Sequence, residues 1–304
     1  MTHALAASER TLHFPVQRVL VEGGRAMIDY ERLEAQFAEA KQCWDAADPF
    51  PFCVMDGFLN PATAERIASD FPATMGRINK LPKSHHDVEQ KRGVPLLDAM
   101  SDSQREFFQQ VQSPEFLEFL ERLTGISPLY ADPHLNGGGL HEIYAGGFLN
   151  VHADFNFHPT MGHLRCLNLI VYLNPDWDDA WNGQLELWSE DFSGAPVKVS
   201  PQMNRAALFR TSETSWHGHP KPLAAPEGVS RRSLAVYYYT DWPEGLEQRA
   251  VTTYMLTPDQ KDDLIRELTA AADQIHNEKD AVRLAPRYSP RHVRAVYKEL
   301  FERS

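Results

Sequence analysis

The residues best suited to chemistry are His152 and Asp154, which lie inside the stretch GGFLNVHADFN at positions 146–156. In an extended chain, side chains two positions apart point to the same face, so this imidazole and this carboxylate converge on one point. A histidine from elsewhere in the chain would complete a set of two histidines and one carboxylate around a metal ion. Such a set leaves coordination positions open and suits non-haem Fe(II).

The spacing alone is weak evidence, because chance produces about one H-x-D triplet in a chain of this length and composition. This chain contains a second triplet, His85 to Asp87, which lies in the charged stretch KLPKSHHDVEQKRG and is better interpreted as part of a solvated loop. His152 and Asp154 instead follow an apolar run and precede the long apolar stretch LRCLNLIVYLN at 164–174. We therefore favour the later pair.

Two downstream segments offer the remaining parts of a site. The sequence SWHGHP at 215–220 contains His217 and His219, which share a face in an extended chain, so either could be the third ligand. Arg231 and Arg232 then open an apolar run, in which one should face inward and the other outward. A buried guanidinium is costly without an anionic partner and can bind a carboxylate through two hydrogen bonds. The inward arginine therefore predicts a ligand that carries a carboxylate.

Periodicity places these residues in a mainly β core with flanking helices. Apolar residues at helical spacing predict helices at 31–47, 61–71, 113–125, 258–275 and 290–301. Short extended runs predict strands at 50–59, 140–144, 149–152, 164–173, 184–188, 197–200, 206–209, 215–219 and 233–240. Many short strands separated by turn residues favour a double-sheet jelly roll, and the polar stretch 74–95 is predicted to be a surface loop.

The same pattern predicts three parts along the chain. Residues 1–138 form an N-terminal support region of helices and a strand, residues 139–243 form the jelly-roll core, and residues 244–304 form C-terminal helices. No composition shift marks a clean linker between them.

Composition argues against several classes of function. The net charge is −12 and the basic runs are no longer than pairs, so we expect no nucleic-acid partner. The cysteines, Cys43, Cys53 and Cys166, are few and odd in number, which favours a reducing compartment over a disulfide framework. No apolar stretch has the length of a signal peptide or a membrane span. We expect a soluble cytoplasmic protein without a membrane partner, and the sequence leaves its oligomeric state open.

The order of motifs from 140 to 242 carries a family resemblance. In chain order the motifs are Tyr144, His152-Ala153-Asp154, Arg165, Tyr172-Leu173-Asn174, WNGQLEL at 181–187, Asn204-Arg205, His217 and Arg231-Arg232-Ser233. This order resembles the Fe(II)- and 2-oxoglutarate-dependent dioxygenase superfamily, specifically its prolyl-4-hydroxylase-like branch. The resemblance implies a double-stranded β-helix, which is the cupin-like form of the jelly roll.

The resemblance also implies roles for the candidate metal ligands. His152, Asp154 and His217 look like the iron ligands. His217 is preferred over His219 because the first histidine of the pair matches the family's position. Asp154 is the carboxylate that related halogenases lack, so its presence favours hydroxylation, although desaturation, epimerisation and ring closure can use the same ligands.

For the cosubstrate, the resemblance implies that Arg231 anchors the distal carboxylate of 2-oxoglutarate, with Arg232 as the alternative. Tyr144 and Tyr172 match positions where the family places hydroxyl groups near this cosubstrate. The segment PKPLAAPEGVS at 220–230 is longer than we expect for the family, which leaves the choice between the two arginines open.

The expected function is therefore hydroxylation of an unactivated C–H bond by a dioxygenase that uses Fe(II), 2-oxoglutarate and O2, with ascorbate as a candidate reductant. The expected substrate is a small molecule, such as an amino-acid derivative, because the chain shows no peptide-binding module. Residues 74–95 and 220–230 could then form a lid. The alternatives are a prolyl hydroxylase acting on protein, a zinc-dependent hydrolase or isomerase, and a β-sandwich protein that binds without catalysis.

Overall fold

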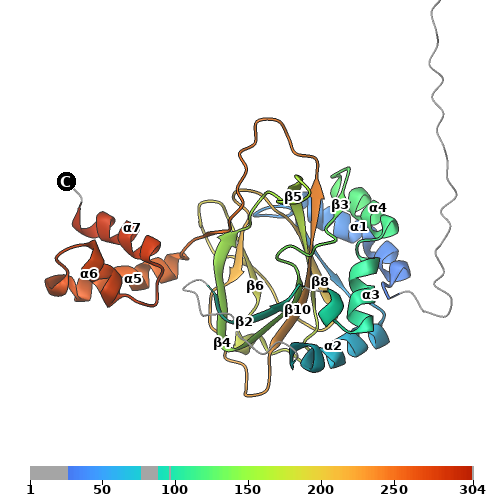
Figure 1. Cartoon of the computed structure of the whole chain (residues 1–304), viewed down its shortest axis with the longest axis horizontal. Coiled ribbons are helices and arrows are strands. Elements are labelled where there is room, and N and C mark those ends of the chain that lie inside the picture. The colour runs from blue at the N-terminus through green and yellow to red at the C-terminus, as the bar shows by residue number, and fades with distance from the viewer. Residues whose placement is uncertain (1–26, 77–87, 96, 303–304) are drawn as a thin grey trace, which may run out of the picture.

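The structure is a computed structural model that describes residues 27–76, 88–95 and 97–302. Its centre is an 11-stranded sheet in which the strands follow the order β1-β8-β5-β10-β4-β9-β6-β7, while β2 and β11 pair with β4 and β3 pairs with β10. The sheet curls into a barrel with helices on one flank and a separate group of helices beyond the other (Figure 1). The predicted jelly-roll core with flanking helices is confirmed.

The strands bear out most of the sequence prediction. They are β1 (Phe52–Asp56), β2 (Val88–Val94), β3 (Tyr130–Ala131), β4 (Gly139–Ala153), β5 (Leu164–Tyr172), β6 (Leu185–Trp188), β7 (Val197–Val199), β8 (Arg205–Arg210), β9 (Trp216–His219), β10 (Arg231–Thr240) and β11 (Thr253–Tyr254). The predicted surface loop at 74–95 is wrong over 88–94, because these residues form β2. His85 and Asp87 lie outside the described residues.

The long strand β4 organises the barrel. Two strands were predicted here, at 140–144 and 149–152, with a turn between them; they instead form one strand, Gly139–Ala153, which has a positive φ at Gly146 and a shift in its register with β2 where the two predicted strands meet. The first part of β4 pairs with β10 and the last part with β9. Its other edge carries β2 and then β11. The strand therefore brings β9, β10, β2 and β11 around one interior.

Four helices cover one side of the barrel: α1 (Tyr30–Ala46), α2 (Pro61–Gly76), α3 (Asp102–Gln110) and α4 (Pro114–Thr124). Their apolar residues join those of β5, β8 and β10 in one core cluster. Helix α4 begins and ends as predicted, with Ser113 as N-cap and Gly125 as a left-handed C-cap. Helix α2 runs past the predicted end near Phe71 and tolerates Pro72, and α3 was not predicted.

The last helices, α5 (Pro258–Ala270), α6 (Glu278–Leu284) and α7 (Pro290–Phe301), have an apolar cluster of their own. Helices α5 and α7 begin at the predicted residues, with Thr257 and Ser289 as N-caps, but α5 ends at Ala270 and not at the predicted residue 275, and α6 was not predicted. Short 3-10 turns lie at Leu97–Ala99, Asp179–Trp181 and Ala272–Gln274. In the described part of the chain, no helix combines the length and apolarity that crossing a bilayer requires.

Candidate metal centre and its cavity

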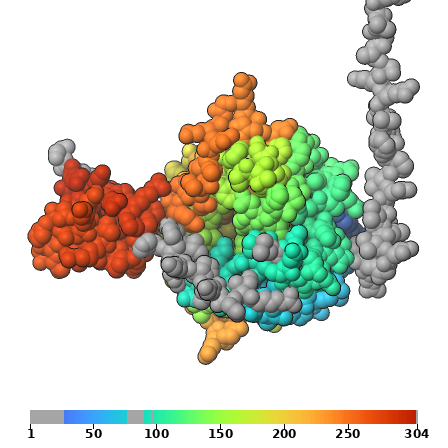
Figure 2. All heavy atoms as spheres, in the orientation of Figure 1, coloured from blue at the N-terminus to red at the C-terminus, as the bar shows by residue number. Residues whose placement is uncertain are grey.

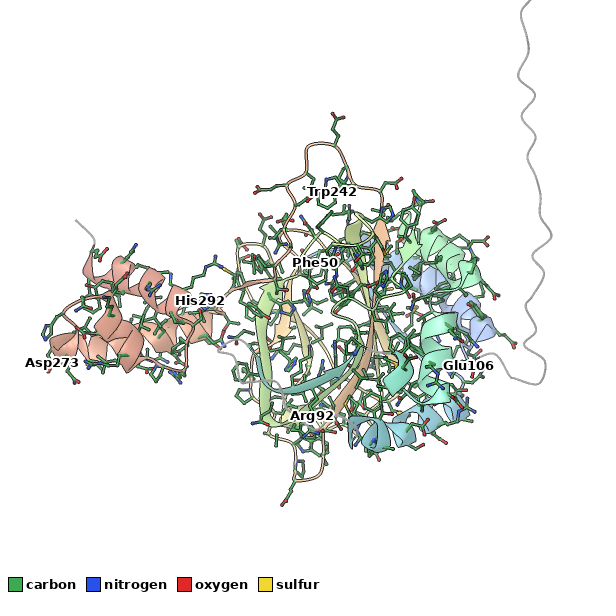
Figure 3. All side chains as sticks on the ribbon, viewed as in Figure 1. Phe50, Arg92, Glu106, Trp242, Asp273 and His292 are labelled. Atoms are coloured by element: carbon green, nitrogen blue, oxygen red, sulfur yellow. The ribbon has the colours of Figure 1, made fainter. Side chains whose placement is uncertain are left out.

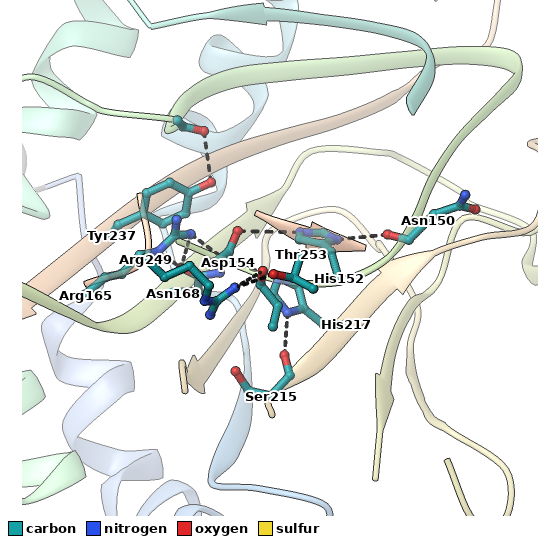
Figure 4. A network of polar contacts seen from close by, with 12 residues as sticks. Asn150, His152, Asp154, Arg165, Asn168, Ser215, His217, Tyr237, Arg249 and Thr253 are labelled. Atoms are coloured by element: carbon teal, nitrogen blue, oxygen red, sulfur yellow. Dashed lines mark hydrogen bonds and ion pairs between the residues drawn. The ribbon is translucent and has the colours of Figure 1, made fainter. Parts of the chain in front are cut away.

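The barrel interior brings His152, Asp154 and His217 together (Figure 4). His152 of β4 pairs directly with His217 of β9, and Asp154 follows the end of β4. One ligand atom from each residue lies within 4.8 Å of the others, and all three residues are buried. Nε2 of His152 is 3.6 Å from Oδ1 of Asp154, and Nε2 of His217 is 3.3 Å from Oδ2. No other group of this kind occurs among the described residues.

Both histidines are held with their Nε2 atoms free for a metal. Nδ1 of His152 lies 2.9 Å from the carbonyl oxygen of Asn150, and Nδ1 of His217 lies 2.9 Å from that of Ser215. A carbonyl oxygen only accepts, so each Nδ1 carries the proton and each Nε2 presents its lone pair to the centre. Burial also lowers the pKa of His152, which keeps the ring neutral as metal binding requires.

The close approach of β9 to β4 depends on Gly218, which lies between His217 and His219. A Cβ atom at this position would come within 2.8 Å of the carbonyl oxygens of Leu149 and Asn150. Any larger residue would push the two strands apart and separate the ligands. This explains the glycine of the H-G-H motif.

Asp154 is kept ionised by Arg165, whose site role the sequence prediction missed. Nη2 of Arg165 donates to Oδ2 of Asp154 over 2.8 Å, and Nδ2 of Asn168 donates to the same oxygen over 3.0 Å. Burial by itself raises the pKa of Asp154, but Arg165 and then His217 outweigh it and hold the pKa well below the usual carboxyl value. Arg165 is itself fixed, because its guanidinium lies 3.3 Å from the ring centroid of Tyr237.

The three candidate ligands open onto a cavity of about 180 Å³. Its other lining side chains include basic, aromatic and small residues from the surrounding strands. They are Lys91, His141, Ile143, Leu149, Phe155, Arg165, Asn168, Ile170, Leu185, His219, Arg231, Ser233, Ala235, Tyr237, Thr252 and Tyr254. The single carboxylate among the described lining residues is that of Asp154.

Arg231 faces this cavity and Arg232 does not. The buried guanidinium of Arg231 donates from Nε to the carbonyl oxygen of Gly183 over 2.7 Å and from Nη2 to the hydroxyl of Tyr172 over 3.3 Å. No described carboxylate pairs with it. Arg232 points to the other face of the sheet, where its Nε lies 3.2 Å from Oε1 of Glu142. The geometry therefore distinguishes the two arginines, which the sequence could not.

The two candidate tyrosines are placed differently. Tyr172 is fully buried and its hydroxyl accepts from Arg231. Tyr144 points away from the cavity and donates to Glu142, so the structure does not bring it to the site that the sequence prediction gave it. His219 lines the cavity but stays outside the group of three ligands.

A segment after the barrel strands also closes over the centre, and the sequence gave no signal for it. In β11, Thr253 pairs with Ala153 and Tyr254 with His152. Arg249 fastens this segment, because its Nη1 donates to the carbonyl oxygen of Ala153 over 3.1 Å and to the hydroxyl of Thr253 over 3.1 Å (Figure 4). Thr252 and Tyr254 thereby become part of the cavity wall.

These residues fit a divalent metal ion together with an anionic chelating ligand. Two neutral imidazoles and one ionised carboxylate supply three donor atoms on one side of a buried centre, and the remaining side faces the cavity. The guanidinium of Arg231 is buried in the same cavity without a carboxylate partner, an arrangement that an anionic ligand would complete.

Comparisons with known proteins agree with this geometry. Residues 138–239 match the family described as the 2OG-Fe(II) oxygenase superfamily. The mouse protein named "Prolyl 3-hydroxylase OGFOD1" is 23% identical over 228 residues, which are 69% of this chain but only 38% of that protein.

Among solved structures, one of prolyl 4-hydroxylases from Phytophthora capsici has 19% identity and a TM-score of 0.51, over 92% of this chain and 82% of that chain. This likeness shows a shared fold. HygX from Streptomyces hygroscopicus, solved with nickel, 2-oxoglutarate and hygromycin B, has 14% identity and a TM-score of 0.48, over 73% of this chain and 98% of that chain.

Proposed function

We propose that the chain is an Fe(II)- and 2-oxoglutarate-dependent dioxygenase that hydroxylates an unactivated C–H bond, because residues 138–239 match the 2OG-Fe(II) oxygenase superfamily. The observation that carries this proposal is the presence, in one cavity, of the three candidate ligands and of Arg231 without a carboxylate partner. In this reading His152, Asp154 and His217 hold the metal, and Arg231 with Tyr172 holds the distal carboxylate of 2-oxoglutarate.

The chemistry supplied by bound Fe(II) couples reduction of O2 to decarboxylation of 2-oxoglutarate, giving succinate and CO2 and placing one oxygen atom on the substrate. The chain's own residues position the reactants. The backbone carbonyls of Asn150 and Ser215 fix both imidazole rings, and Arg165 keeps Asp154 ionised. The buried walls limit access of water, which protects a reactive centre from side reactions.

We propose a small molecule as the substrate. The size of the cavity, about 180 Å³, supports this reading, as does the segment with Thr252 and Tyr254 that covers the metal centre. The second candidate is a prolyl residue in a protein, which the name of the mouse relative favours. The two readings differ in the length of substrate that the cavity mouth admits, so a screen should include free amino acids and proline-containing peptides.

The test is an anaerobic titration of Fe(II) and 2-oxoglutarate into the metal-free protein, followed through the weak visible charge-transfer band of the chelate. We expect the wild type to develop the band. His217→Gln should lose metal binding, whereas His163→Gln, outside both the cavity and the group of three ligands, should keep it. If folded wild-type protein developed no band, the proposal that it binds Fe(II) would be refuted. The metal content of the purified protein would then test the zinc alternative.

The assignment of Arg231 has a matched control in its neighbour. Arg231→Met should weaken 2-oxoglutarate binding far more than Arg232→Met, because Arg232 is paired with Glu142 on the opposite face. Equal effects of the two substitutions on the dissociation constant would remove Arg231 from the cosubstrate site.

A further inference from the structure

Strand β2 places a second cation beside Arg231. Ile143 of β4 pairs with Arg231 of β10 on one edge and with Lys91 of β2 on the other. Residues paired directly across neighbouring strands project to the same face of the sheet. All three side chains accordingly line the cavity, although Lys91 was expected in a surface loop.

The two cations have no carboxylate partner among the described residues. The single carboxylate among the described lining residues, that of Asp154, already forms an ion pair with Arg165. Burial and the neighbouring Arg231 lower the pKa of Lys91 to about 8, which shows that the ammonium group lies in the electrostatic field of the guanidinium. Two cations that face one cavity repel each other, and an anion bound between them would offset this repulsion.

His219 gives an independent sign that a polar ligand belongs in this part of the cavity. Its side chain is only 3% exposed, and neither ring nitrogen has a hydrogen-bond partner. Its ring lines the same cavity as Arg231 and Lys91. Buried polar atoms are rarely left unpaired, which points to a ligand with polar oxygens.

The existing bonds of Arg231 explain why one cation is not enough. Its Nε already donates to Gly183, and Nη2 is shared with Tyr172, so its most favourable bidentate edge is partly occupied. A carboxylate has two oxygens with about four acceptor positions. One oxygen can receive the free donors of Arg231, and the other needs a further donor.

We propose that Lys91 is that donor: it binds the distal carboxylate of 2-oxoglutarate together with Arg231, and the ring of His219 provides a polar contact beside them. This inference rests on the proposed function and adds a second charged residue to its cosubstrate site. It also predicts strong selection for 2-oxo acids that carry a distal carboxylate.

The experiment compares two 2-oxo acids on Fe(II)-loaded protein under anaerobic conditions, with the chelate band as readout. The first is 2-oxoglutarate, and the second is 2-oxopentanoate, which has the same chain length but no distal carboxylate. For Lys91→Met we expect a dissociation constant for 2-oxoglutarate at least roughly tenfold higher, the usual effect of losing a hydrogen bond to a charged group. Binding of 2-oxopentanoate should change by less than about twofold.

The matched control is Arg92→Met, which removes a positive charge from the next residue of the same strand. Arg92 pairs in register with Glu142 and lies over the ring of Tyr144, on the face that points away from the cavity. We expect it to bind 2-oxoglutarate like the wild type. Lys91→Arg retains the charge and should recover most of the affinity for 2-oxoglutarate. A band in Lys91→Arg would also show that strand β2 tolerates substitution at this position without misfolding.

Three results would overturn the assignment of Lys91. Wild-type affinity for 2-oxoglutarate in Lys91→Met would remove it from the site. An equal loss for both oxo acids would give it a structural role. A higher KM for the substrate that the enzyme oxidises, with 2-oxoglutarate binding unchanged, would place Lys91 at the substrate instead. A wild type without a chelate band is a different outcome, because it refutes the proposed function itself.

Discussion

Asp154 owes its charge and its direction to a small number of contacts. Arg165 and Asn168 both donate to its Oδ2, which leaves Oδ1 turned toward His152. Arg165 is almost completely buried between this carboxylate and the aromatic faces of Phe155 and Tyr237. A charged pair at this depth is strongly destabilised when one partner is removed, since the other charge remains buried without compensation.

Arg165→Met should therefore weaken metal binding by about 10- to 100-fold, the usual effect of losing a residue that orients a ligand. The loss should grow as the pH falls, because Asp154 without its cation has a higher pKa and is protonated at a higher pH. Isothermal titration with Mn(II) at neutral and acidic pH measures both effects. Arg210→Met, on an exposed position of β8, is the control. Unchanged metal affinity in Arg165→Met would show that Asn168 alone suffices to orient the carboxylate.

At the scale of elements, the metal centre is enclosed by the segment from Arg249 to Met255. Its backbone is tied to β4 and to the chain just beyond it, because the amide of Met255 donates to Val151 and Asn156 and Arg249 exchange hydrogen bonds. The side chain of Arg249 adds contacts to Ala153 and Glu213. The segment is thus held mainly by polar contacts around one arginine.

Arg249→Ala should loosen this segment without removing the metal ligands. We expect faster hydrogen exchange at residues 249–255 and a higher KM for the substrate, because Thr252 and Tyr254 lose their fixed positions in the cavity wall. Exchange in α4 provides an internal reference, and Arg266→Ala, on the exposed side of α5, provides the control variant. Exchange at the wild-type rate in 249–255 would mean that the backbone bonds of β11 hold the segment by themselves.

Among the elements, those set by local interactions could be predicted from the sequence, and those set by distant partners could not. The two residues of H-x-D lie on one face through local strand geometry, and the helix caps at Ser113, Thr257 and Ser289 are local too, so all of these were readable. The continuity of strand β4 could not be predicted from the sequence. Gly146 and Gly147 look like a turn, and Gly146 has a positive φ of 78°, but their backbone exchanges hydrogen bonds with Leu223 from a distant segment, which holds them within β4.

Non-local packing also determines the structure of two other segments. The stretch at 220–230 is anchored to the barrel by Leu223 and Ala225, which are buried against Ile143 and Trp177. Strand β2 has a polar sequence, and its pairing with β4 puts Lys91 into the cavity. Neither property follows from periodicity, because both depend on which strand happens to lie alongside.

At the scale of the whole molecule, helices α5–α7 form a lobe that projects from the barrel (Figure 2). Polar contacts connect this lobe to the metal centre. Nε2 of Gln260 donates to the side chain of Asn150 over 2.9 Å, and Asn150 in turn holds His152. His292, at the junction of the two parts, lies 3.1 Å from the carbonyl oxygen of Tyr254 (Figure 3). We propose that the lobe is a separate folding unit, with its boundary near residue 243 as the sequence predicts.

Substitution of Leu268, which is fully buried in the apolar cluster of the lobe, tests this division. Leu268→Ala should cost about 2–5 kcal/mol, because it removes buried methyl groups and leaves a cavity. A lobe with a small core of its own should then unfold in a separate transition at lower denaturant concentration. All tryptophans lie at or before Trp242, and within the described ranges only Trp188 of these lines a pocket shared with residues of the lobe, so their fluorescence reports mainly on the barrel, whereas far-ultraviolet circular dichroism also reports on the lobe.

In Leu268→Ala we therefore expect an early loss of helical signal, while the tryptophan transition and the Fe(II) affinity change little. The control is Leu208→Ala, which opens a comparable cavity in the core cluster of the barrel and should shift the tryptophan transition. If both probes shift together in Leu268→Ala, the lobe and the barrel unfold as one cooperative unit. The contacts of Gln260 and His292 would then be strong enough to couple the C-terminal helices to the stability of the metal centre.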